Sequence, residues 1–65
     1  MINIKAEEDF TEVILYNLNG SEVYTEQCLN TSKLLLDLNL DQGVYLVKIK
    51  TIEGRYLSRR FQIVN

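Results

Sequence analysis

Apolar and polar residues alternate along most of the chain with a period of two, which is typical of β-strands. The pattern predicts strands at residues 2–5, 13–18, 23–27, 34–38, 44–50 and 55–64. Short runs with turn signals about every eight to twelve residues indicate an antiparallel sandwich or barrel. We therefore expect an all-β fold, a small antiparallel immunoglobulin-like β-sandwich of about six to seven strands.

Residues 13–18 are apolar at nearly every position, which predicts an inner strand covered on both faces. The acidic residues 7–9 and the polar residues 27–32 break the alternation and predict a solvated turn and a loop. Leucines fill most of residues 34–38, where helix and strand are both open. We favour a strand because the run is shorter than the roughly ten residues of a helix.

Asparagine and glycine mark the predicted turns. In Asn17-Leu18-Asn19-Gly20 the first side chain can bond to the backbone two residues on. Gly20 can supply the positive φ of a type I turn with a following bulge. Residues 39–43 and Gly54 predict two further turns.

The pattern Asp41-x-Gly43-x-Tyr45-x-Val47 has the form of a tyrosine corner. In immunoglobulin-like sandwiches a Tyr near the start of a late strand forms a hydrogen bond back to the upstream backbone. The alternative, compatible with the first, is that Tyr45 is a β-favouring core aromatic.

Composition limits the chemistry. The chain has 65 residues, of which 46% are hydrophobic, and we expect one domain spanning residues 1–65. It has no His and a single Cys, so Ser-His catalysis and an intramolecular disulfide are excluded. We expect no enzyme activity, no metal, no cofactor, no transmembrane segment and no N-terminal export signal.

Charge is unevenly distributed. Residues 1–41 carry eight acids and two bases, a net −6, and residues 42–65 carry one acid and five bases, a net +4. The basic part could face a polyanion, or its charges could lie on exposed strand positions and complement the acidic part. We favour the second interpretation, since mixed surface charge is usual.

Two blocks together resemble the C-terminal sorting domain of the type IX (Por) secretion system. In the first, an apolar strand leads into the Asn17-x-x-Gly20 turn, and Val23 follows three residues later. In the second, a Leu-rich run precedes Asp41-x-Gly43-Val44-Tyr45 and an alternating strand. Gly54 and the basic pair Arg59-Arg60 follow before the last apolar strand.

The chain departs from the family pattern in three places. It lacks the Pro-Asn-Pro opening, its 36–43 stretch is about one residue short, and Arg replaces the commoner Lys in the basic pair. We expect the chain to be a fragment excised from a larger secreted protein.

The resemblance implies a secretion signal that directs attached N-terminal cargo across the outer membrane through the translocon. It implies cleavage by a sortase-like cysteine peptidase, replacement by a surface anchor, and passage through the periplasm to the medium or cell surface. We expect Arg59 and Arg60 to be the translocon-recognition residues. The family-motif positions are Asn17, Gly20, Val23, Asp41, Gly43, Tyr45 and Gly54.

Rival interpretations remain. A non-catalytic immunoglobulin-like adhesion or carbohydrate-binding module would need an exposed aromatic platform. A small nucleic-acid binder is opposed by the acidic net charge, and we expect no nucleic-acid partner. A homodimer through edge strands is a further expectation. The acids at residues 7–12 match no Ca²⁺ loop, and Cys28 has no expected role beyond a cross-linking hazard.

Overall fold

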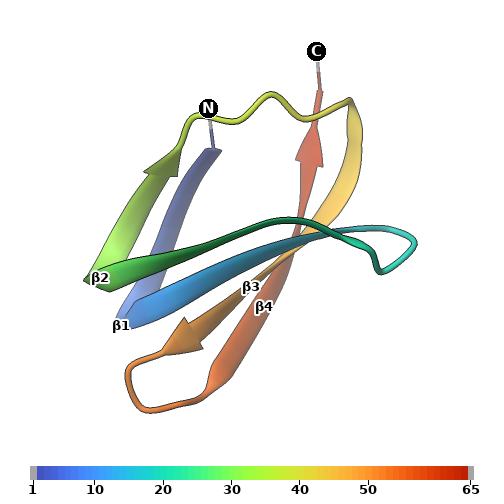
Figure 1. The fold of residues 1–65 in the computed structure, drawn as a ribbon. Helices are drawn as coiled ribbons and strands as arrows, with labels where there is room; N and C mark the ends of the chain where they lie inside the picture. The colour runs from blue at the N-terminus through green and yellow to red at the C-terminus, as the bar shows by residue number, and fades with distance from the viewer. Residues whose placement is uncertain (1, 65) are drawn as a thin grey trace.

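The computed structural model describes residues 2–64, and of residue 29 only the backbone. Four strands make one antiparallel sheet in the order β2-β1-β3-β4 (Figure 1). They are β1 (Ile2–Asn17), β2 (Glu22–Leu36), β3 (Gly43–Thr51) and β4 (Tyr56–Ile63). The all-β prediction is confirmed, and residues 2–64 include no helix able to span a membrane.

The first two strands are long and bent, and here the sequence prediction was wrong. Residues 7–9 belong to β1 and residues 27–32 to β2, so the six predicted runs lie in four strands. The pairing of β1 with β2 shifts register between Lys5 and Phe10 and again between Phe10 and Glu12. Such irregularities bend a strand while its backbone stays extended, so polar residues mark a bend here and not an end.

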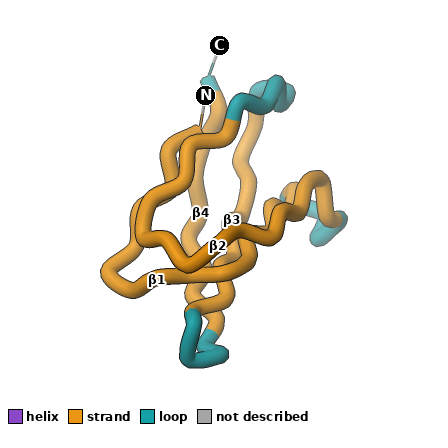
Figure 2. Tube along the Cα trace, turned by 60° about the vertical axis from the view of Figure 1, so that its left-hand side comes forward, coloured by secondary structure: helices purple, strands orange, loops and turns teal. Residues whose placement is uncertain are grey.

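The bend turns the open end of the β1–β2 hairpin, where β1 begins and β2 ends, toward β3 and β4, as Figures 1 and 2 show. Residues from both parts of the hairpin then meet β3 in one interior. The core consists of Ile4, Phe10, Val13, Leu15, Leu36 and Ile49. This arrangement is compatible with a β-sandwich, which stays a prediction in its detail.

The inner position predicted for residues 13–18 is confirmed, since β1 lies between β2 and β3. The predicted cover on both faces is wrong. Val13 and Leu15 are fully buried, whereas Ile14 and Tyr16 on the opposite face are only half-buried. Leu18 lies in the turn with 75% of its surface exposed. One face of the sheet therefore makes the interior and the other meets solvent.

The leucine segment is strand as predicted, although β2 ends at Leu36. Leu38 and Leu40 lie beyond it, half-buried against the core, in the connection to β3. Since this connection carries two core contacts, it holds the β1–β2 and β3–β4 hairpins together from outside the strands.

Candidate functional site

Strand β4 carries the two arginines that the sequence singled out. Arg59 pairs with Val47 of β3 and Arg60 pairs with Leu46, so their side chains leave opposite faces of the sheet. Both side chains are exposed. The structure therefore separates the basic pair into two environments.

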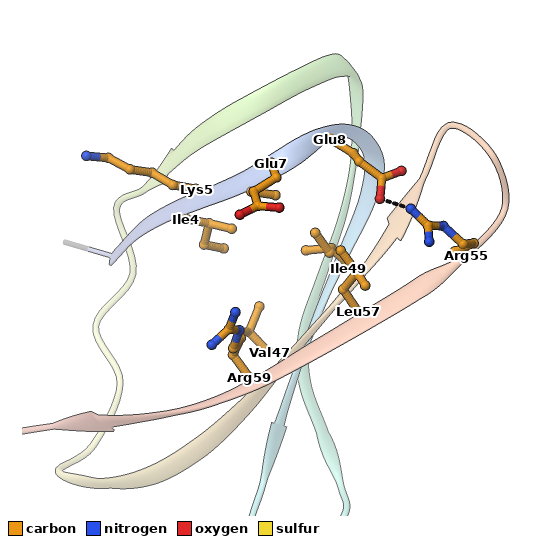
Figure 3. Close-up of a pocket in the computed structure, with 10 residues that line it drawn as sticks. Ile4, Lys5, Glu7, Glu8, Val47, Ile49, Arg55, Leu57 and Arg59 are labelled. Atoms are coloured by element: carbon orange, nitrogen blue, oxygen red, sulfur yellow. Dashed lines mark hydrogen bonds and ion pairs between the residues drawn. The ribbon is translucent and has the colours of Figure 1, made fainter.

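Arg59 lies on the interior side, in a groove between the first half of β1 and β4 (Figure 3). Val47 and Ile49 of β3 and Leu57 of β4 line the same space. The groove results from the bend of β1, which brings Ile4 over β3 without pairing the first half of β1 with β4. We refer to it as the inner groove.

Arg60 lies on the solvent side with two lysines of β3. The Lys48 Nζ lies 4.5 Å from the centre of the Tyr56 ring, and the Lys50 Nζ lies 5.9 Å from it. Cations at this distance from an aromatic face are attracted to it. Lys48, Lys50, Tyr56 and Arg60 form what we call the outer basic face. Neighbouring strands thus concentrate the positive charge that the sequence placed in its last third.

An ion pair joins the bend of β1 to the β3–β4 turn. The Arg55 guanidinium donates to Glu8 Oε2, across 47 positions of sequence. The other carboxylate oxygen, Glu8 Oε1, is buried and has no hydrogen-bond partner within the described chain. Beside this pair, the Ile52 amide donates to the Asp9 carbonyl at 3.1 Å. These contacts hold one end of the inner groove.

Tyr45 forms the backward hydrogen bond that the sequence pattern predicts. Its hydroxyl donates to the Asp41 carbonyl at 2.7 Å. The ring also stacks on Phe61 with 5.7 Å between ring centres, so it is both a corner and a core residue. The bond ties the connection before β3 to the sheet, and Gly43 between them opens β3.

Two turns use the same device. Asn17 Oδ1 accepts from the amides of Asn19 and Ser21, each at 3.0 Å, and Gly20 has a φ of +83°. In the β3–β4 turn, Thr51 Oγ1 accepts from the Arg55 amide at 3.1 Å, and Gly54 has a φ of +87°. The predicted turn chemistry at Asn17 and Gly20 is confirmed.

Val23 is the family-motif position for which the structure shows no specific role. It lies in β2 directly after the first turn, and 39% of its surface is exposed. Its exposed surface could contact another protein, but no neighbouring residue in the described chain indicates which.

Two groups of β2 have shifted titration. The Tyr24 hydroxyl donates to the Glu26 carboxylate, and this bond raises the pKa of Tyr24, with smaller contributions from desolvation and the Glu26 charge. Burial raises the pKa of the Cys28 thiol, and Glu26 raises it further. The thiol lies 3.7 Å from the Phe10 carbonyl, inside the bend. A raised pKa disfavours the thiolate, so this cysteine is a poor nucleophile.

The described residues offer no cluster of three or more His, Cys, Asp or Glu side chains that could hold a metal ion. What the arrangement can provide is binding: an open strand edge on β4, an apolar groove with one arginine, and a basic outer face. Sequence reasoning missed Thr51 and the contacts of Glu8 and Tyr56, whereas Lys48 belongs to the basic part that it identified. Thr51 was detectable, since it stands three residues before Gly54 as Asn17 stands before Gly20.

One family model matches almost the whole chain. Its description is "Secretion system C-terminal sorting domain", and it matches residues 1–64. The comparisons with curated proteins and with solved structures gave no match.

Proposed function

The chain belongs to the family of secretion-system C-terminal sorting domains, and on that premise we propose that it carries attached cargo through the type IX translocon and is then removed. The family accounts for the coarse function, a C-terminal sorting signal for export across the outer membrane. The removal by a sortase-like cysteine peptidase, the replacement by a surface anchor and the transit through the periplasm are the finer parts of the proposal.

The match over residues 1–64 is the single observation that carries the function. The structure supports it with a rigid frame for recognition. Turns at Gly20 and Gly54 and the Tyr45 bond fix the ends of β1, β3 and β4. A receptor can therefore read a fixed shape.

We propose that the translocon reads β4, through Arg59 or Arg60. Both side chains are exposed, and the ion pair described within residues 2–64 uses Arg55 and not either of them. Arginines without an internal acidic partner are available for a carboxylate of a receptor.

An export assay tests the function. The chain is fused behind an N-terminal export signal and a fluorescent reporter, in a bacterium that has this secretion system. We expect the reporter to reach the medium or cell surface, and to stay in the periplasm of a translocon-deficient strain. A reporter that lacks residues 1–65 is the matched control. Equal export with and without the chain would contradict the proposal.

The same fusion tests removal. If the peptidase cuts ahead of the domain, the 7.6 kDa chain is absent from the exported reporter in a peptidase-containing strain only, as an antibody against the chain would show. An exported reporter that still carries the chain in that strain would reject cleavage and leave the sorting function unaffected.

An adhesion or carbohydrate-binding module is the second candidate. It would use a flat group of exposed aromatic rings. Among the aromatic side chains of residues 2–64 only Tyr56 is exposed, and it lies beside Lys48. This observation does not favour the second candidate.

A further inference from the structure

The inner groove is longer than one pocket. Two hollows of about 600 and 360 Å³ lie end to end along it. Both are lined by Ile4, Lys5, Val47 and Arg59, so they form one continuous channel. Its walls are the first half of β1 and the length of β4, and its floor is β3.

Both walls are open strand edges. β1 pairs with β3 only from Phe10 to Asn17, so residues 2–9 have no described strand on that side. β4 pairs with β3 alone. Apart from the Asp9 carbonyl, which accepts from the Ile52 amide, the backbone groups along these edges are open to an added strand.

The spacing between these edges rules out direct pairing and is compatible with an inserted strand. No Cα of β1 lies within 8 Å of a Cα of β4 in the described chain. One inserted strand that pairs with both edges needs about 9.6 Å, twice the usual spacing between neighbours. A direct β1–β4 pairing would need about half of that, and it does not occur.

The groove is apolar with one charge left over. Its apolar lining consists of Ile2, Ile4, Ala6, Val47, Ile49, Leu57, Phe61 and Ile63. Its charged lining consists of three bases and two acids, Lys5, Arg55, Arg59, Glu7 and Glu8, a net +1. Arg55 is bonded to Glu8, which leaves Lys5, Glu7 and Arg59, and of these Lys5 and Arg59 line both hollows. One acidic residue on an occupant would balance the groove.

We propose that the inner groove takes up one extended peptide strand of the secretion machinery, with an Asp or Glu opposite Arg59 and apolar side chains two positions to either side. This inference rests on the proposed function and makes it specific. The strand would pair through its backbone with open edges and place alternate side chains on the apolar floor.

The same geometry disfavours a second copy of the chain as occupant. Two copies related by a twofold axis and joined through β4 would bring like edges together. In the register that centres the axis on Arg59, the two Arg59 side chains would face each other, and like charges directly opposite across a strand pair are destabilising. An acidic strand from a different protein has no such conflict.

The proposal separates Arg59 from Arg60, and a peptide titration tests that separation. The probe is a synthetic peptide as long as β4 that alternates Val and Thr and carries Glu at its centre. A matched peptide carries Lys there. We expect the Glu peptide to bind about tenfold more tightly than the Lys peptide, since one charge pair distinguishes them. Bound peptide should protect amides of residues 2–9 and of β4 from hydrogen exchange.

Two single substitutions complete the titration. Arg59→Glu should reverse the preference in favour of the Lys peptide, which a merely unfolded variant could not do. Arg60→Glu lies on the opposite face and should leave the preference unchanged. Equal binding of both peptides, or protection confined to the outer basic face, would overturn the proposal. So would sedimentation that shows a dimer whose β4 amides are protected without peptide.

Export of one groove variant and one outer-face variant separates the two proposals. If the wild-type fusion is exported through the translocon, Arg59→Glu should reduce export by about tenfold, whereas Ser58→Glu on the opposite face of β4 should not. Equal export of both variants would reject the groove proposal and leave the sorting function intact. Failure of the wild-type fusion would sink the sorting function, while the peptide titration would still decide whether the groove binds a strand.

Discussion

The β1–β2 hairpin contains most of the buried apolar residues, and the β3–β4 hairpin contains most of the basic residues. Five of the seven buried apolar residues belong to the first hairpin, and the second supplies Tyr45 and Ile49. The second hairpin holds five of the seven basic residues, and every side chain of residues 52–60 is exposed. The comparison teaches that the first hairpin supplies most of the buried apolar surface, while the second presents most of the basic charge to solvent.

The largest expected loss of stability comes from a substitution in the core of the first hairpin. Phe10 is fully buried at the bend, so Phe10→Ala should cost about 3–5 kcal/mol of unfolding free energy. A domain of this size has little more to lose, and the variant should be largely unfolded by circular dichroism. Phe61→Ala is the matched change in the half-buried position of β4, and it should cost about 1–2 kcal/mol. Equal losses at the two positions would remove the division between the hairpins.

The two turns give a second, smaller test. Gly20 and Gly54 have nearly the same φ, and a Cβ at either would meet no atom within 4 Å. The penalty of Gly→Ala is therefore backbone strain alone, about 1–2 kcal/mol at each position. Urea unfolding should give equal losses for Gly20→Ala and Gly54→Ala. A clear inequality would mean that one turn is held by more than its own geometry.

These turns also show what sequence could predict. Asn17, Gly20 and Gly54 were identified because their chemistry is local, and the opposite faces of Arg59 and Arg60 follow from strand alternation. The bends at residues 7–9 and 27–32 were missed because polarity suggested ends. Whether a polar segment stays in a strand depends on the neighbour it pairs with, which lies far away in sequence.

The inner groove could not be predicted for the same reason. It exists only because β1 bends and then pairs with β3 from Phe10 onward, which leaves residues 2–9 facing β4 across a gap. Glu8 belongs to an acidic run that appeared to be solvated, yet the bend aims it at Arg55. Long-range strand pairing therefore determines where the inner groove forms, while local sequence determines the turns and strands that build it.

Tyr45→Phe sharpens the comparison by removing one hydroxyl. The lost bond to the Asp41 carbonyl should cost about 1 kcal/mol, with the Phe61 stack retained. Tyr56→Phe on the outer basic face should change unfolding free energy by less than about 0.5 kcal/mol. Thermal unfolding of the pair measures both. A neutral Tyr45→Phe would mean that water replaces the corner bond without loss.

The smallest effect is a pH dependence that belongs to the first hairpin. The pKa of Cys28 is raised above its ordinary value of 9.0, so the folded state holds this proton more tightly than the unfolded state. The stability it contributes is complete below that ordinary value and is lost as pH rises through the folded pKa. Stability should therefore fall in mildly alkaline buffer, and Cys28→Ala should flatten this part of the profile. An unchanged slope in Cys28→Ala would assign the dependence to another group, Tyr24 included.

The bend in β1 also sets how the domain responds to force. Residues 2–5 are held by β2 on one side only, whereas residues 12–16 are held by β2 and β3 together. A force applied at the start of β1 first breaks the hydrogen bonds of residues 2–5 to β2 one after another. It then reaches residues 12–16, whose bonds to β2 and β3 must break together. The strand therefore yields in two steps, and the floor of the inner groove is uncovered before the core residues Val13 and Leu15 are disturbed.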